Sequence, residues 1–178
     1  AADLLSQAEH GTDSQVILLS DNEKVISKTL FELKEQLNKL PRKAIADKAL
    51  KNSKTIIFKN ISECIEFSNL YAPEHLILAC TKASKLIPLV SKAGSVFLGN
   101  YSCESAGDYA SGTNHTLPTN GYARNYSGVS LDSFMNKITF QEITKEGIRN
   151  IGHAIELMAE AEKLFAHRNA VTLRLKKE

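Results

Sequence analysis

The chain has 178 residues, of which 43% are hydrophobic and 24% are charged, and its formal net charge is +2 at pH 7. This composition is typical of a folded globular protein and argues against disorder. The charge is spread along the chain, which argues against a nucleic acid or a membrane surface as partner and favours a small molecule. No apolar run approaches the ~20 residues of a membrane span.

The cysteines indicate a reducing compartment. Cys64, Cys80 and Cys103 are odd in number, and their spacings match no zinc ribbon. Free thiols in a cytoplasmic protein are the expected state for such a set. The first residues lack the segments of a signal peptide. The chain also lacks an initial methionine and opens within a predicted helix at Asp3, so we expect it to belong to a longer protein.

Short apolar runs alternate with helical periods along the first hundred residues. The runs are rich in β-branched residues and nearly continuous, as in strands covered on both faces. They predict strands at residues 15–19, 55–58, 75–79 and 95–98. Helices are expected after Asp21 or Asn22, after Asn60 and after Thr81, which are residues suited to N-caps. Pro41 ends the first of these helices, and a second short helix is predicted over 42–50. The alternation predicts an α/β fold.

The composition and periodicity of the sequence change after residue 99. Residues 100–128 are rich in glycine and serine with little periodicity, which indicates a functional loop or binding surface. A short strand is predicted at 138–140, and one long helix from Thr144 past Met158. That helix is apolar enough to need a partner or a domain to dock on. We therefore expect a partial α/β domain over 1–129 and a helical arm over 130–178.

The most telling local motif is the segment Ala72-Pro73-Glu74-His75-Leu76. It places a carboxylate and an imidazole side by side at the start of a predicted strand. Glutamate can activate a water, and histidine can take a proton from an alcohol near neutral pH. Taken alone, the pair is better interpreted as a solvated surface pair, because loops are polar in any case.

Two further segments carry groups suited to a metal. Gln7 and His10 are three residues apart and project from one face of a helix end, where partial negative charge favours a cation. In the segment from Glu104 to His115, glycines at 107 and 112 give the backbone freedom to aim Asp108 and His115 inward. The alternatives are a surface histidine in the first segment and a plain cluster of turns in the second.

Glu162 and His167 form the last candidate group. On an ideal helix, residues five apart lie roughly 140° from each other, which argues against a rigid pair on one face. A solvated helix face is the simpler interpretation of these two residues alone. Across the whole chain, however, two histidines, an aspartate and an amide oxygen make a mixed site for zinc or a similar divalent metal.

The strings SQAEHG, APEHL, AGSVFLG, ESAGDYASGTNHTLPT and AHRNAVTLR occur in this order from the first residue almost to the last. Together they resemble the C-terminal part of bacterial histidinol dehydrogenase. The resemblance implies a zinc enzyme of histidine biosynthesis. Such an enzyme oxidises L-histidinol to L-histidinal and then to L-histidine, passing a hydride to each of two NAD+ molecules.

The resemblance also implies roles for individual residues. His75 would be the general base, and Glu74 would activate the water that attacks the aldehyde. The metal would be bound by Gln7, His10, Asp108 and His167. The substrate would be contacted by Gln7, His10, His75, Asp108, His115, Glu162 and His167. In the family the site is completed across a homodimer, whose C-terminal arm supplies the equivalents of Glu162 and His167 to the partner.

The family enzyme is more than twice as long as this chain, which would correspond to its C-terminal portion. Most cofactor contacts would lie elsewhere, and no G-x-G-x-x-G sequence stands between a strand and a helix here. NAD is therefore implied by the resemblance alone, with its binding residues unknown. Pattern and resemblance together predict an incomplete Rossmann-like layered sheet with flanking helices and a mostly helical C-terminal arm.

Because the cofactor contacts would be missing, we expect no or negligible turnover from the chain alone. Two other functions remain as alternatives to an enzyme. One is a non-catalytic module that binds a metal or a small molecule, and the other is an oligomerisation domain in which the C-terminal helix matters and the polar residues lie on the surface.

Overall fold

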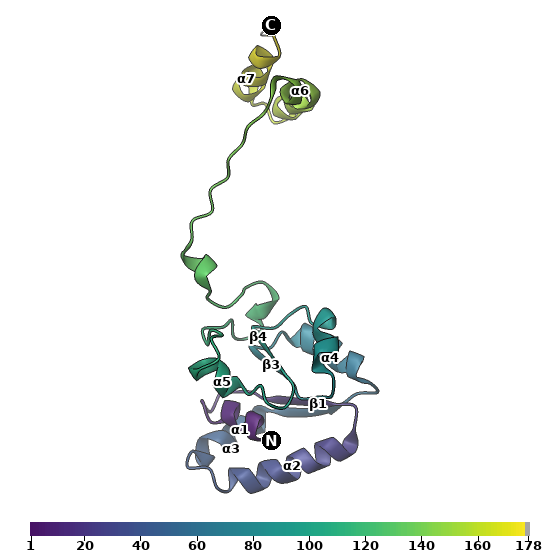
Figure 1. Cartoon of the computed structure of the whole chain (residues 1–178), viewed down its shortest axis with the longest axis vertical. Coiled ribbons are helices and arrows are strands. Elements are labelled where there is room, and N and C mark those ends of the chain that lie inside the picture. The colour runs from purple at the N-terminus through teal and green to yellow at the C-terminus, as the bar shows by residue number, and fades with distance from the viewer. Residues whose placement is uncertain (177–178) are drawn as a thin grey trace. The chain divides into compact units, whose positions relative to one another are not determined.

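The computed structural model describes residues 1–176; Lys177 and Glu178, at the end of the predicted arm, lie outside the described residues. The described chain is an α/β protein with short parallel strands and flanking helices (Figure 1). It divides into two compact units, Ala1–Phe134 and Met135–Glu178. The assignment of separate roles to residues 1–129 and 130–178 stays a prediction.

The first pair of strands is parallel, with Ile17 opposite Lys54. Parallel neighbours need a crossover connection, and two helices supply it here. The strands are β1 (Ile17–Ser20) and β2 (Lys54–Ile57), and the helices are α2 (Glu23–Leu37) and α3 (Lys43–Asn52). The side chain of Asn22 caps α2 by accepting a hydrogen bond from the Lys24 amide. The helix ends before Pro41, as predicted.

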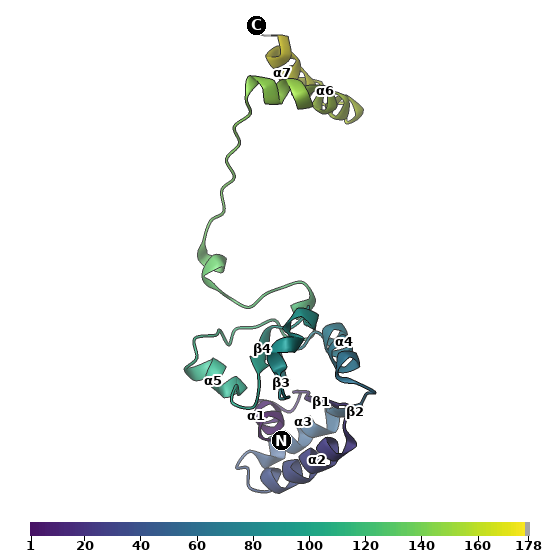
Figure 2. The same cartoon turned by 45° about the vertical axis from the view of Figure 1, so that its right-hand side comes forward.

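The first helix, α1 (Ala2–Ala8), packs against α3 through small side chains. Ala8, Ala46 and Ala49 are all fully buried and form one cluster. Figures 1 and 2 show α1, α2 and α3 gathered beside the β1 and β2 pair. Alanine contacts let helix backbones approach closely, so the end of α1 has a defined place in the first unit.

The second pair is β3 (His75–Leu78) with β4 (Ser95–Leu98), again parallel, with His75 opposite Ser95. Helix α4 (Ile61–Tyr71) precedes β3, and the Asn60 side chain caps it by accepting from the Glu63 amide. All four predicted strands are confirmed to within two residues. A Rossmann-like layering stays a prediction, because the described strands form two separate two-stranded sheets.

Two sequence predictions in the first unit were wrong in detail. The helix expected after Thr81 is a short 3-10 helix, η1 (Ala83–Leu89), because Lys82 is left-handed with φ 62° and Pro88 cannot continue an α-helix. The segment expected to be a loop contains a helix, α5 (Glu104–Tyr109). It is followed by 3-10 turns at Tyr122–Arg124 and Leu131–Phe134.

The second unit is a helical hairpin. Its helices are α6 (Lys145–Ala161) and α7 (Phe165–Lys176), and Gly152 lets the Leu175 side chain approach the α6 backbone. The prediction of one long helix was wrong, because Lys163 adopts φ 60° and reverses the chain.

The strand predicted at 138–140 was also wrong. That segment has no regular structure, and the second unit, as described, offers no strand to pair with it. An isolated strand leaves its backbone groups without partners. Among the helices of residues 1–176, none combines the length and apolar character needed to cross a membrane.

A tight backbone contact sets where β3 begins. The amide of Gly94 donates to the carbonyl of Pro73 at 2.9 Å, and the amide of Ser95 donates to that of Glu74 at 2.8 Å. A Cβ at residue 94 would lie 2.6 Å from the Glu74 carbonyl oxygen, a distance that backbone atoms cannot tolerate. Only glycine fits at this point without a shift of one strand.

We predict that Gly94→Ala lowers the free energy of unfolding by about 1–3 kcal/mol, because the new methyl group forces β3 and β4 apart. Urea denaturation followed by circular dichroism would measure it. Gly11→Ala is the control, because the only close contact of its Cβ is with the Asp13 carboxylate, at 2.7 Å, and that side chain can turn away. Equal stability of the Gly94 variant and the wild type would contradict the prediction.

Candidate functional site

The loop before β3 presents Glu74 and His75 from a rigid backbone. Ala72 follows the last residue of α4 as its C-cap; it is fully buried and left-handed with φ 56°, and its amide donates to the Ser68 carbonyl at 2.8 Å. Beyond it, the hydrogen bonds from Gly94 and Ser95 hold the chain on the far side of the turn. The direction in which His75 enters the strand is therefore determined by the backbone.

Helix α5 brings two acids to the same place. Glu104 and Asp108 are four residues apart, so they share a face of the helix. His75, Glu104 and Asp108 offer nitrogen and oxygen atoms that all lie within 4.8 Å of one another. His75 Nε2 lies 4.0 Å from Glu104 Oε1.

The role predicted for Gly107 was wrong. It lies inside α5 and aims no loop; a Cβ there would meet the Phe97 ring at 2.9 Å and Thr113 Oγ1 at 2.8 Å. The glycine instead lets α5 lie directly against β4. Gly112, by contrast, has φ +89°, a conformation that favours glycine. His115 is nevertheless exposed, so the expectation that it points inward was wrong.

Helix α1 contributes the amide and imidazole of the Gln7-Ala8-Glu9-His10 segment. Leu5 and Ala8 are its buried residues, and the carbonyl of His10 accepts a hydrogen bond from Arg42 at 3.4 Å. The Nε2 atom of Gln7 is buried without a hydrogen-bond partner. The segment is thus held beside the acids with an unused donor.

Burial and neighbouring charges shift the pKa values of Glu104 and His75 in this cluster. Burial raises the pKa of Glu104 to about 7, and a hydrogen bond with Asp108 adds to the effect, while the Gln7 amide opposes it. Burial also lowers the pKa of His75, against the charges of Glu74 and Asp108. His75 is consequently a neutral imidazole at pH 7 with carboxyl groups around it, which is the state a proton acceptor needs.

Two of the predicted residues, His75 and Asp108, come together with Glu104 in the first unit. Gln7, His10 and Glu74 belong to the same unit and lie near enough to affect the pKa of His75 or of Glu104. His115 lies in the exposed segment that follows α5. Glu162 and His167 belong to the second unit, where both side chains are exposed. The two residues do not share a helical face, as expected, but the reason differs: Glu162 is the C-cap of α6 and His167 lies in α7.

Sequence reasoning missed Glu104, which is only 3% exposed and is the one buried acid of the described residues. The residue stood inside a quoted motif but received no role. Its spacing of four from Asp108 was a usable signal for a shared helix face. The glycines of this segment led to the prediction of a loop, so the helical spacing of the two acids was not considered.

The cluster fits a divalent metal by its chemistry. Imidazole, carboxylate and amide oxygen are ligands that zinc and similar ions accept. The orphaned Nε2 of Gln7 is also informative, since an amide that turns its oxygen to a metal must direct its nitrogen elsewhere. The first unit therefore offers three candidate ligands, Gln7, His10 and Asp108, from two separate segments.

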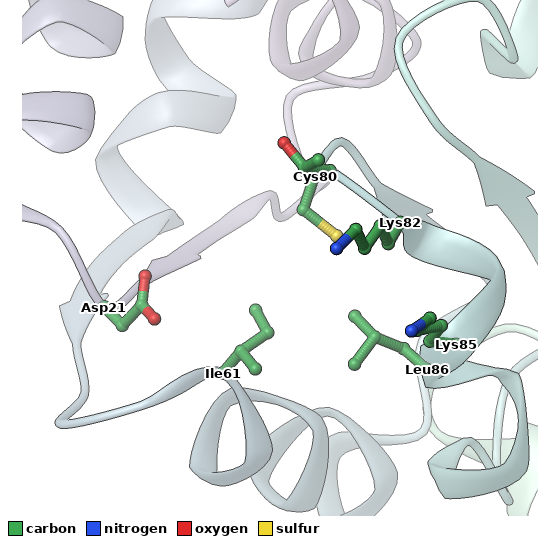
Figure 3. A pocket seen from close by; sticks show the side chains of 7 residues that line it. Asp21, Ile61, Cys80, Lys82, Lys85 and Leu86 are labelled. Atoms are coloured by element: carbon green, nitrogen blue, oxygen red, sulfur yellow. The ribbon is translucent and has the colours of Figure 1, made fainter.

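A cavity of about 320 Å³ lies beyond the carboxyl end of β3. Figure 3 shows side chains that follow β1 and β3 turned toward a common space. It is lined by Asp21, Ile61, Cys80, Thr81, Lys82, Lys85 and Leu86. None of these belongs to the His75 cluster, which lies at the amino end of the strand.

The fold and the cluster define an α/β protein with an imidazole and two carboxyl groups gathered in its first unit, and comparisons with known proteins identify its family. The histidinol dehydrogenase family model matches residues 1–175. A histidinol dehydrogenase of Bacteroides thetaiotaomicron is 60% identical over 175 residues. The chloroplastic histidinol dehydrogenase of Arabidopsis thaliana is 56% identical over 177 residues. The chain belongs to the histidinol dehydrogenase family.

A solved structure of a similar protein supports the same family assignment. The crystal structure of histidinol dehydrogenase from Elizabethkingia anophelis superposes with a TM-score of 0.90 at 67% identity, over 98% of this chain and 40% of that one. The sequence matches cover 98% and 99% of this chain but only 41% of the Bacteroides protein and 38% of the Arabidopsis protein. The chain thus spans about two fifths of its relatives' length; its assignment to their C-terminal portion stays a prediction.

The raised pKa of Glu104 predicts an unusual pH dependence of stability. Between its unfolded pKa of 4.5 and its folded pKa of about 7, the folded state binds the extra proton, so stability falls as pH rises. The metal-free wild type should lose roughly 2–3 kcal/mol between pH 4.5 and 7.5 from this group. Urea denaturation across this range measures it. Glu104→Gln should remove that loss and Glu66→Gln, at an exposed site, should keep it; equal slopes in all three would refute the assignment.

Proposed function

We propose that this chain is part of a zinc-dependent, NAD-linked dehydrogenase that oxidises L-histidinol through L-histidinal to L-histidine. One observation carries the proposal: the imidazole of His75, whose pKa burial lowers, offers a nitrogen within 4.8 Å of carboxylate oxygens of Glu104 and Asp108 in a chain of this family. The names of the relatives support the substrate and the reaction.

The acid–base step is assigned to the loop before β3. His75 takes the proton from the alcohol oxygen, and its lowered pKa keeps it able to accept one at pH 7. The adjacent Glu74 activates the water that adds to the aldehyde. The two groups are distinct in chemistry, which suits a reaction that needs both an alcohol deprotonation and a nucleophilic water.

The metal is assigned to Gln7, His10, Asp108 and His167. A zinc ion bound there would hold the substrate through its nitrogen atoms and orient it. The first three residues gather in one unit, which supports their part of the assignment. His115 and Glu162 are assigned to substrate contacts, along with Gln7, His10, His75, Asp108 and His167.

We further propose a homodimer in which the arm after residue 130 completes the partner's site with Glu162 and His167. Large apolar side chains on α6 and α7 are exposed, including Leu157, Met158 and Phe165, and their burial would favour association. Sedimentation of the full-length protein as a monomer would contradict this proposal.

The residues that bind the nicotinamide cofactor stay unknown, and most of them are proposed to lie outside this chain. The sequence has no glycine-rich phosphate loop between a strand and a helix, so NAD is proposed from the family alone. We expect no or negligible turnover from the chain by itself. A cytoplasmic location remains our expectation from the free thiols, Cys64, Cys80 and Cys103.

A zinc-binding measurement on the chain distinguishes a metal site from a set of ordinary surface residues. We expect zinc to bind with a 1:1 stoichiometry in a competition titration against a chromophoric chelator. His10→Ala and Asp108→Asn should each weaken binding at least tenfold, because each removes a ligand. His153→Ala, at an exposed histidine outside the site, is the matched control. Equal affinities across all four proteins would contradict the metal assignment.

An activity measurement on the full-length protein distinguishes an enzyme from a non-catalytic binding module. In a full-length protein that contains this chain, His75→Ala should lower kcat for NADH formation from L-histidinol by about 10²–10⁴-fold, the usual contribution of a general base. His153→Ala should leave it unchanged. The isolated 178-residue chain should form no NADH. Full activity of the His75 variant would overturn the catalytic assignment and favour the non-catalytic module.

A further inference from the structure

The turn that carries Glu74 and His75 lies between two neighbours. Along the chain it follows the last turn of α4, and in space it is hydrogen-bonded to the start of β4. A side chain that joins these two neighbours would hold the turn from outside. Asn69, a half-buried residue in the last turn of α4, is such a side chain.

The side chain of Asn69 makes three hydrogen bonds to one short loop, residues 89–92, which precedes β4. Its Nδ2 atom donates to the carbonyl of Leu89 at 2.8 Å. Its Oδ1 atom accepts from the amides of Ser91 at 2.9 Å and Lys92 at 3.2 Å. All three partners are backbone groups, so Asn69 constrains the path of the loop itself. An amide supplies the donor and the acceptor together, which neither a carboxylate nor an aliphatic side chain does.

The same loop leads directly into the backbone contact that holds the turn. The amide of Gly94 donates to the carbonyl of Pro73 at 2.9 Å. The amide of Ser95 donates to the carbonyl of Glu74 at 2.8 Å. The turn therefore lies inside a closed ring of contacts, in which the Asn69 side chain joins the helix to the loop.

A second side chain joins the same two segments. The guanidinium group of Arg124 donates to the carbonyl of Leu70, one of the end carbonyls of α4 that the helix itself leaves without a partner. The carbonyl of Arg124 accepts from Lys92 Nζ at 2.8 Å. The end of α4 is thus joined to the loop by two independent sets of hydrogen bonds.

We propose that Asn69 is a positioning residue, which holds the turn before β3 and thereby sets the direction of the Glu74 and His75 side chains. It acts through the loop and takes no part in proton transfer or metal binding. A displacement of about 1 Å in a reacting group can lower a rate by about 10²-fold, so a small shift of this turn would be felt in catalysis. The catalytic part of this inference rests on the proposed function, whereas the structural part does not.

The competing interpretation is that Asn69 only stabilises the end of α4. A residue of that kind changes the free energy of unfolding and leaves the geometry of the turn unchanged. Asn22 offers a matched case, because its side chain caps α2 in the same unit by accepting from the Lys24 amide. Asn22→Ala therefore shows the effect of losing an asparagine hydrogen bond on which no catalytic group depends.

The first test measures kcat and KM for NADH formation from L-histidinol in a full-length protein that contains this chain. We expect Asn69→Ala to lower kcat by about 10–100-fold with a much smaller change in KM, because the other proposed substrate contacts keep their places. Asn69→Asp keeps the oxygen that accepts from the two loop amides, so its kcat should lie between those of the wild type and Asn69→Ala. It also replaces Asn69→Ala in every comparison should the latter not fold. Asn22→Ala should keep the wild-type kcat.

Hydrogen–deuterium exchange of the same proteins, followed by mass spectrometry, measures the turn without substrate. The peptide that contains the amides of Gly94 and Ser95 should exchange several-fold faster in Asn69→Ala than in the wild type or in Asn22→Ala, because the hydrogen bonds to the turn open more often. A peptide spanning β2 is the internal reference and should exchange at the same rate in the wild type and in Asn69→Ala.

Unchanged kcat or unchanged exchange of the Gly94 peptide in Asn69→Ala would overturn the positioning role. Equal losses of kcat in Asn69→Ala and Asn22→Ala would overturn it as well, since they would reflect stability alone. If the wild-type protein forms no NADH, or if His75→Ala keeps full activity, the proposed function fails. The exchange rates then decide by themselves whether Asn69 holds the turn.

Discussion

The close approach of Gly94 to the carbonyl of Glu74 is the contact on which the site depends. It brings the start of β4 against the turn before β3, and two backbone hydrogen bonds hold the strands there. The position of His75 follows from that turn rather than from side-chain packing. A catalytic group carried by a backbone constraint keeps its direction while neighbouring side chains change rotamer.

The remaining groups reach His75 from elements that are distant in sequence. Helix α1 is located by alanine packing on α3, and α5 is located by the contact of Gly107 with Phe97. In both places a missing or minimal side chain allows the approach. The polar cluster is therefore supported by close-packed small residues, which leave little room for the functional side chains to move.

The burial of Glu104 beside other acids does not favour the stability of the folded protein. An apolar side chain of the same size would cost nothing to desolvate, whereas this carboxyl group holds a proton with a pKa of about 7. Such violations of the usual placement of charge are common where function requires them. They also explain why Glu104 received no role from the sequence, in which nothing marks a residue as buried.

The sequence by itself determined the four strands, the caps at Asn22 and Asn60, and the residue types of the site, because these depend on local periodicity and short-range hydrogen bonds. It could not determine that residues 138–140 lack a partner strand, or that Lys163 reverses the chain. Only the tertiary structure placed Glu104 beside His75. That arrangement depends on which surfaces of α1, α5 and β3 pack together, and packing joins residues that no spacing in the sequence relates.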